Sequence, residues 1–183
     1  MRIGVVTFPG SLDDRDAQRA VKEAGAEAVA LWHGDESLHN VDAVILPGGF
    51  SYGDYLRCGA ISRFAPVMTT IIERAKGGLP VLGICNGFQA LVKSGLLPYG
   101  NFEDISANSP TLFYNDANQH VAKMVETRII NTNSPWLRGV QVGDIHAIPV
   151  SHGEGKFVLS DEEFASLCEN GQIWSQYVDF DGQ

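Results

Sequence analysis

The segment Val81–Gln89, VLGICNGFQ, places a cysteine between two glycines at the end of an apolar run. Glycines two positions before and two positions after Cys85 give the spacing of a nucleophile elbow, in which a strand turns sharply into a helix. Side chains at these glycine positions would collide, and the strained turn exposes the nucleophile at the carboxyl end of the sheet. The segment therefore predicts a strand over Pro80–Ile84 and a helix that continues to about Ser94.

The first half of the chain alternates β-rich apolar runs with helical patterns, which is typical of βαβ units on a parallel sheet. The expected strands are Ile3–Phe8, Ala26–Leu31 and Asp42–Gly49, and the expected helices run from a cap at Ser11 or Asp13 to about Ala24 and from about Arg63 to Lys76. Continuously apolar strands indicate a sheet covered on both faces. We therefore expect an α/β fold with an open, mostly parallel sheet and helices on both faces.

The second half of the chain has a different pattern. A polar segment over Asn101–Asn118 is interpreted as a loop, and later runs predict strands that are largely antiparallel. These strands are His120–Ile129, Asp144–Val150 and Gln172–Val178. Between the last two strands, Ser160 and Glu163 form the pattern of a capping box that begins a helix, and Gly171 ends that helix.

Composition excludes several classes of function. The 183 residues carry 13 Lys and Arg against 22 Asp and Glu, a net charge of −9, without the basic stripe typical of proteins that bind nucleic acid. No apolar run approaches the ~20 residues that cross a bilayer. The cysteines number three and lack metal-ligand spacing, which argues against a disulfide framework or structural metal and favours a reducing, cytoplasmic location.

The thiol of Cys85 has a functional interpretation and a structural one. As a nucleophile it would be activated by the amides that begin the following helix, which could also hold a developing oxyanion. As a structural residue it would simply be buried, as free cysteines often are. The segment Pro47–Asp54, PGGFSYGD, favours the first interpretation because it follows a predicted strand and emerges at the same sheet edge. An oxyanion hole could then combine the Gly49–Phe50 backbone with the Asn86 amide, although the segment could also be an ordinary turn.

The pairing of PGGF with GICNGFQ resembles class I glutamine amidotransferases, whose glutaminase domain uses a Cys-His-Glu triad. The segments Gly48–Phe64, GGFSYGDYLRCGAISRF, and Pro149–Phe157, PVSHGEGKF, are similar to the branch of that family that serves phosphoribosylformylglycinamidine synthase in purine biosynthesis. The resemblance runs along the whole chain. It implies a flavodoxin-like fold, hydrolysis of L-glutamine, and delivery of the ammonia to a synthetase subunit or a fused synthetase domain.

The resemblance also implies roles for individual residues. Cys85 matches the nucleophile that forms a thioester with the side chain of glutamine. Gly48, Gly49, Phe50 and Asn86 match the region that holds the oxyanion, and Gln89 matches a residue near the glutamine pocket. No cofactor is expected in this chain, whereas ATP and Mg²⁺ are expected on the synthetase, which converts formylglycinamide ribonucleotide to formylglycinamidine ribonucleotide.

The resemblance places the triad His and Glu in a late His-x-Glu motif that would lie beyond Gln183. We therefore expect residues 1–183 to be a single, C-terminally incomplete glutaminase domain that is inactive or very weak alone. His152 and Glu154 have the spacing of a base and its orienting carboxylate, but the resemblance places them in a separate supporting loop. The other histidines, His33, His39, His120 and His146, are interpreted as surface or core residues.

The long segment after Gly49 is richer in aromatic and charged residues than a minimal connection requires. The residues Tyr52, Asp54, Tyr55 and Arg57 are interpreted as a wall of the glutamine pocket that also faces the synthetase, since aromatic residues and Arg are enriched at interfaces.

Two alternatives to a glutaminase stay open. One is a non-catalytic module that binds glutamine or docks on the synthetase, and the other is a redox or stress protein built on the same elbow.

Overall fold

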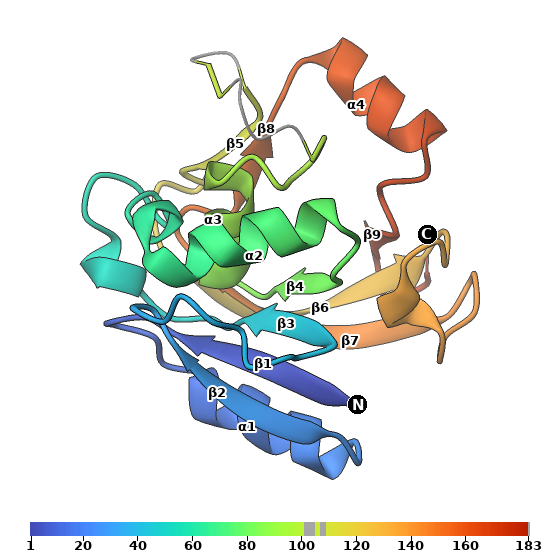
Figure 1. Cartoon of the computed structure of the whole chain (residues 1–183). Coiled ribbons are helices and arrows are strands. Elements are labelled where there is room, and N and C mark those ends of the chain that lie inside the picture. The colour runs from blue at the N-terminus through green and yellow to red at the C-terminus, as the bar shows by residue number, and fades with distance from the viewer. Residues whose placement is uncertain (101–104, 107–108, 183) are drawn as a thin grey trace. The chain divides into compact units, whose positions relative to one another are not determined.

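The computed structural model describes residues 1–100, 105–106 and 109–182 of the chain. The chain divides into two compact units, Met1–Ala107 and Asn108–Gln183. Each unit has its own hydrogen-bonded strands (Figure 1). A single glutaminase domain over residues 1–183 remains a prediction.

The first unit is built on a parallel sheet of four strands in the order β2-β1-β3-β4. In Figure 1, helix α1 covers one face of this sheet, and α2 and α3 cover the other. The elements are β1 (Arg2–Thr7), α1 (Asp14–Glu23), β2 (Glu27–Trp32), β3 (Ala43–Leu46), α2 (Pro66–Lys76), β4 (Val81–Gly83) and α3 (Asn86–Lys93), with 3₁₀ turns at Ser51–Asp54 and Ser62–Phe64. The prediction of a parallel sheet between two helical layers is confirmed.

The strand order determines where a ligand can bind. After β2 the chain crosses to the other side of β1, so the segments that follow β1 and β3 diverge at the carboxyl edge of the sheet. Open α/β sheets bind ligands in the crevice formed at such a switch point. Beneath this edge, the core consists of aliphatic side chains from the strands and α2, among them Val6, Leu31, Val44, Leu46 and Met68.

The second unit is antiparallel. Strand β6 (Val121–Ile129) pairs with β7 (Ile145–His152) on one side and with β9 (Ser175–Val178) on the other. Helix α4 (Asp161–Glu169) begins at the predicted capping box, in which Glu163 N–H donates to Ser160 Oγ at 3.2 Å and Ser160 N–H donates to Glu163 Oε2 at 2.9 Å. The antiparallel strands and the capped helix are confirmed.

One loop prediction is wrong in part. Of the predicted loop Asn101–Asn118, residues 101–104 and 107–108 lie outside the described part of the chain, and the remainder contains β5 (Thr111–Phe113). This strand pairs antiparallel with β8 (Lys156–Val158), far along the sequence. With three residues and one buried side chain, Leu112, the strand has almost no alternation to identify it, because its formation depends on a distant partner.

Helix α3 packs against β3 through backbone atoms. A Cβ added to Gly87 would overlap the Leu46 carbonyl oxygen and would lie 2.5 Å from the carbonyl carbon. A Cβ on Gly83 would in turn lie 2.7 Å from the Gly87 carbonyl oxygen. Both glycines of the elbow are therefore required by close backbone contacts, as the sequence predicts.

A second constraint fixes the segment that follows β3. The Tyr52 hydroxyl is hydrogen-bonded to His33 Nδ1 at 2.7 Å, and Tyr52 N–H donates to the Pro9 carbonyl at 2.6 Å. The ring of Tyr52 lies 6.1 Å from that of Phe8, between centroids, and packs against the core cluster. Tyr52 therefore anchors this segment to the ends of β1 and β2.

We expect Gly87→Ala to destabilise the protein by at least about 3 kcal/mol, because a methyl group cannot be accommodated against a carbonyl of the central sheet. The matched control is Gly34→Ala, whose added Cβ meets only Trp32 Cδ1 at 3.5 Å, an ordinary contact. Urea unfolding of both variants measures the difference. Equal midpoints would contradict this account of the elbow.

Burial raises the pKa of Tyr52 above its ordinary value of 10.0. An unfolded tyrosine then ionises at a lower pH than the folded one. The contribution of Tyr52 to the free energy of unfolding is therefore complete below pH 10.0, and it is lost as the pH rises through the pKa of the folded state. We expect the free energy of unfolding to fall more steeply above that pH in the wild type than in Tyr52→Phe. Urea unfolding of both proteins between about pH 9 and 11 tests this, and parallel curves would contradict it.

Candidate functional site

Cys85 lies between β4 and α3, with an exposed side chain. Its backbone has φ 53° and ψ −113°, a conformation that non-glycine residues seldom adopt and that costs of order 1–3 kcal/mol. The Cys85 carbonyl accepts hydrogen bonds from Phe88 N–H at 3.0 Å and Gln89 N–H at 3.2 Å, which begin the helix. The strand, strained turn and helix of a nucleophile elbow are therefore present, with the thiol presented to solvent.

The segment after β3 lies directly beside this turn. A Cβ on Gly48 would lie 3.2 Å from Cys85 Cβ, a tight contact, so a side chain there would press on the cysteine. Gly49, with φ 136°, pairs with Ser11 in an isolated antiparallel bridge. Phe50 N–H donates to the Gly10 carbonyl at 2.9 Å within that bridge. The segments that follow β1, β3 and β4 thus meet at one edge of the sheet.

These contacts determine which backbone amides are available to the predicted oxyanion hole. Because the Phe50 amide already donates to Gly10, it is not available to a substrate, contrary to the expectation that the Gly49–Phe50 backbone as a whole would contribute. The backbone N–H groups of Gly49 and Asn86, by contrast, donate to no atom of the described residues. Two free amides in the segments next to an exposed thiol are suited to a developing oxyanion.

The side chain of Asn86 connects the elbow to the neighbouring segment. Its Oδ1 accepts from Ser51 N–H at 2.9 Å, and its Nδ2 donates to Asp54 Oδ1 at 2.9 Å and to Gln89 Oε1 at 3.0 Å. The Asn86 side chain is therefore occupied in positioning its neighbours. Ser51, 2% exposed, lies beneath this network, and its hydroxyl has no partner within the described chain.

The predicted interface residues divide into two groups. Tyr52 and Asp54 are half-buried and hold the segment in place, Asp54 by accepting from Asn86 and from Gly59 N–H at 3.3 Å. Arg57 is also half-buried, whereas Tyr55 is 74% exposed. Outward-facing apolar side chains also include two residues that the sequence did not single out, Leu56 at 84% and Phe64 at 75% exposure.

His152 and Glu154 belong to the second unit, at the end of β7, and both are half-buried. Asn115 Nδ2 lies 3.3 Å from His152 Nδ1 and donates to the His152 carbonyl at 3.2 Å. Asn115 N–H also donates to the Gly153 carbonyl at 2.9 Å. These contacts connect residues 151–155, the SHGEG segment, to Asn115, a residue that the sequence pattern did not identify. A role for His152 and Glu154 as a substitute base pair remains a prediction.

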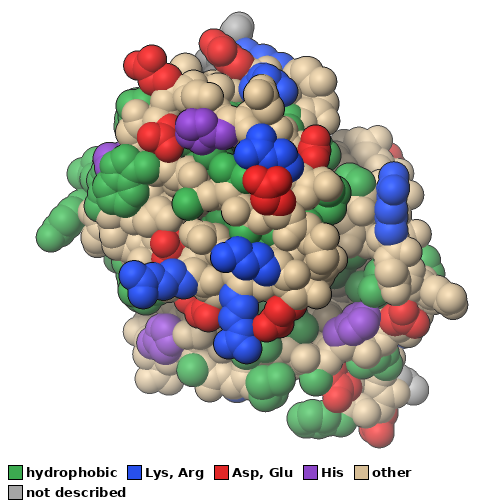
Figure 2. Space-filling view, turned by 60° about the horizontal axis from the view of Figure 1, so that its bottom comes forward, with side chains coloured by type: hydrophobic (Ala, Val, Ile, Leu, Met, Phe, Trp, Pro, Cys, Tyr) green, Lys and Arg blue, Asp and Glu red, His purple; other side chains and the backbone are tan. Residues whose placement is uncertain are grey.

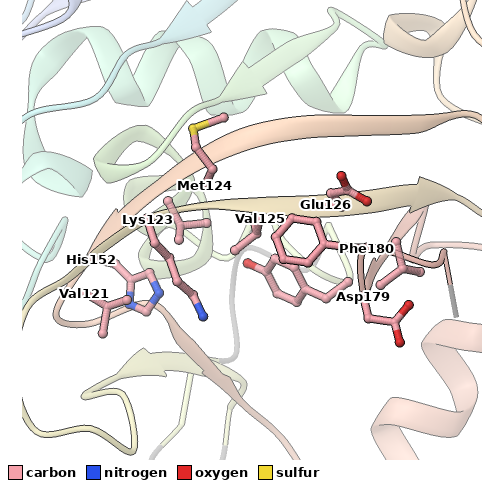
Figure 3. A pocket seen from close by; sticks show the side chains of 11 residues that line it. Val121, Lys123, Met124, Val125, Glu126, His152, Asp179 and Phe180 are labelled. Atoms are coloured by element: carbon pink, nitrogen blue, oxygen red, sulfur yellow. The ribbon is translucent and has the colours of Figure 1, made fainter.

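An open hollow of about 480 Å³ lies on the second unit, over the strands β6, β7 and β9. Figure 3 shows Lys123 and Met124 projecting from opposite faces of β6, as successive strand residues do. Of the predicted site residues, His152 lines this hollow. Within the described chain, no group of three or more His, Cys, Asp or Glu side chains could hold a metal ion.

The composition predicts neither a basic stripe nor an apolar run long enough to cross a bilayer, and the surface charges and the helices bear on these two points. On the face shown in Figure 2, Lys and Arg side chains are interspersed with Asp and Glu. None of the described helices is both long enough and apolar enough to cross a membrane.

Sequence reasoning missed two residues at the edge of the first unit. Asp13, proposed as a helix cap, is the N-cap of α1, but its side chain makes no capping hydrogen bond. It lies instead over Gly48, where an added Cβ would collide with its Oδ2. His33, interpreted as a surface or core residue, holds Tyr52. Neither contact has a signal in the local sequence, because each joins segments far apart in the chain.

This chain is similar in sequence and in structure to subunits of phosphoribosylformylglycinamidine synthase. The phosphoribosylformylglycinamidine synthase subunit PurQ of Leifsonia xyli subsp. xyli is 50% identical over 177 residues, which are 97% of this chain and 72% of that protein. The PurQ subunit of Streptomyces avermitilis is also 50% identical, over 97% of this chain and 71% of its own length. The structure of PurLQS from Thermotoga maritima superposes with a TM-score of 0.81 at 33% identity, over 97% of this chain and 74% of the other.

The sequence pattern of the CobB/CobQ-like glutamine amidotransferase domain matches residues 1–183, a span that includes the elbow, the Gly49 and Asn86 amides and the SHGEG segment. The family resemblance expected from PGGF and GICNGFQ is therefore confirmed. The chain belongs to the CobB/CobQ-like glutamine amidotransferase family.

Proposed function

We propose that this protein is the glutaminase subunit of a phosphoribosylformylglycinamidine synthase. It hydrolyses L-glutamine to glutamate and ammonia, and a synthetase uses the ammonia to convert formylglycinamide ribonucleotide to formylglycinamidine ribonucleotide. The observation that carries the proposal is the exposed Cys85 thiol in a strained elbow beside Gly48, with the free amides of Gly49 and Asn86 nearby. The named relatives support the choice of synthase.

The chemistry follows from these groups. The Cys85 sulfur attacks the side-chain amide carbon of glutamine, and the carbonyl oxygen becomes an oxyanion held by the Gly49 and Asn86 N–H groups. When the tetrahedral intermediate collapses, the C–N bond breaks and the nitrogen leaves as ammonia after gaining the proton that the Cys85 thiol gave up, which leaves a γ-glutamyl thioester. Water then attacks the thioester, releasing glutamate and restoring the thiol.

Ammonia must reach the synthetase unprotonated, because ammonium has no lone pair with which to attack an activated amide. A glutaminase that acts beside its synthetase meets this requirement better than one that releases ammonia into water. ATP and Mg²⁺ would act on the synthetase, where the acceptor amide is activated. The exposed apolar side chains Tyr55, Leu56 and Phe64 provide a surface for that partner on the same unit as Cys85.

We expect Cys85 to react selectively with a chloromethyl ketone analogue of glutamine, in which –CH₂Cl replaces the amide NH₂. The sulfur displaces chloride, and intact-mass analysis should show one adduct that excess glutamine prevents and that Cys85→Ser lacks. Cys58 and Cys168 provide internal controls, because both are retained in the variant. Any glutamate release by the wild type, measured with the synthetase, should be lost in Cys85→Ser because no thioester can form.

Three results would contradict the proposal. Labelling that glutamine does not prevent would show that the thiol has no glutamine pocket. Faster oxidation of Cys85 by peroxide than alkylation by the glutamine analogue would instead favour a redox protein. Selective labelling without glutamate release in the presence of the synthetase would favour the non-catalytic binding module.

We expect the double substitution Tyr55→Ser and Leu56→Ser to weaken association with the synthetase by about tenfold or more, since truncating an interface anchor commonly costs over about 1 kcal/mol. Labelling of Cys85 by the glutamine analogue should be unchanged, which separates docking from the pocket. Sedimentation or calorimetric titration measures the affinity. A matched control is Met124→Ser, another exposed apolar side chain, on the second unit. An unchanged affinity in the double variant would exclude this surface.

A further inference from the structure

The carboxylate of Asp13 lies at the ligand-binding edge of the first unit without a structural task. Asp13 is the N-cap of α1, a position where a carboxylate usually accepts from the first free amides of the helix, yet it makes no such bond. An added Cβ on Gly48 would collide with Asp13 Oδ2 and would lie 3.4 Å from Asp13 Cγ and 3.2 Å from Cys85 Cβ. The carboxylate and the nucleophile therefore adjoin the same glycine.

Backbone contacts hold the Asp13 main chain there, and its side chain is exposed. The Gly48 carbonyl accepts from Leu12 N–H at 3.2 Å and from Asp13 N–H at 3.3 Å, which fixes the end of the β1–α1 segment against the segment after β3. These two segments form the switch point between β1 and β3. Asp13 is thus positioned at the crevice by the same backbone that positions Gly49.

The neighbouring carboxylates are occupied, whereas that of Asp13 is not. Asp14 Oδ2 accepts from Thr7 Oγ1 at 2.8 Å, and Asp54 Oδ1 accepts from Asn86 and from Gly59. Within the described chain, the Asp13 side chain has neither a hydrogen bond nor an ion pair. A free carboxylate beside a nucleophile that reacts as a thiolate is electrostatically unfavourable unless a positive charge occupies the site.

From this geometry we propose that Asp13 binds the α-ammonium group of the glutamine substrate and selects for it. The inference rests on the proposed glutaminase function. Glutamine carries its only positive charge at the other end of a short, flexible carbon chain from the amide that Cys85 attacks, so one molecule can reach both groups. The ammonium would offset the repulsion between the carboxylate and the developing negative charge at the thiol. Asp13 acts in this way as a specificity-determining residue, without a part in bond breaking.

The test uses the full chain and two chloromethyl ketones. One is the glutamine analogue, and the other is its des-amino counterpart, which keeps the carbon chain and the carboxylate but lacks the ammonium. In both cases Cys85 sulfur displaces chloride, and the rate of labelling at subsaturating reagent is followed by intact mass. Iodoacetamide, which resembles neither end of glutamine, reports the intrinsic reactivity of the thiol.

We expect the wild type to react with the amino reagent about 10- to 100-fold faster than with the des-amino reagent, the range given by one hydrogen bond between charged groups. Asp13→Asn should reduce this preference to within about twofold, while the iodoacetamide rate should not fall, because removing the carboxylate removes its repulsion of the thiolate. Asp13→Glu should keep part of the preference, because the charge is retained. The control Asp16→Asn removes an exposed carboxylate from the same helical turn and should leave the preference intact.

The outcomes separate the two proposals. If Asp13→Asn keeps the wild-type preference, or loses reactivity equally toward both reagents, Asp13 does not recognise the ammonium. If the wild type reacts with iodoacetamide but with neither ketone, the glutaminase function itself is wrong. Circular dichroism of each variant establishes that a lost preference does not come from unfolding.

Discussion

The contact between the Gly87 backbone and the Leu46 carbonyl is the constraint on which the rest of the first unit depends. It brings the start of α3 onto the end of β3 with no side chain between them. The turn after β4 must then be so tight that Cys85 takes a positive φ, and its thiol is directed outward instead of into the core. Exposure of the thiol at this position is thus a consequence of packing two layers of an α/β sandwich as closely as backbone atoms allow.

The remaining parts of the site are held by hydrogen bonds that connect loops. Asn86 joins the elbow to the segment after β3 through Ser51 and Asp54, and the Gly10 carbonyl joins that segment to the one after β1. Each of these loops therefore has partners in a neighbouring loop in addition to its own internal bonds. Such mutual support positions amides for a transition state without any single loop being rigid alone, which is how preorganised sites are commonly built.

Features that depend on neighbours in sequence could be predicted. The Gly-x-Cys-x-Gly spacing gave the elbow, the apolar runs gave the parallel strands, and Ser160 with Glu163 gave the start of α4. Features that depend on distant partners could not. Strand β5 pairs with the distant β8, the Tyr52 hydroxyl is held by His33, and the Phe50 amide is withdrawn from the site by Gly10. The side-chain direction of Asp13 belongs to this second group, because a helix-cap pattern predicts a local bond that the folded chain does not make.

The position of Asp13 over Gly48 also links two choices of residue that look independent in the sequence. Any side chain at position 48 would have to share its space with the carboxylate at position 13 and with the Cβ of Cys85. A larger residue at 48 could be considered only together with a smaller one at 13, and it would still press on the nucleophile. In engineering this edge of the sheet, a side chain introduced at position 48 would therefore have to be tested together with changes at position 13, whereas position 13 can be varied while Gly48 is kept.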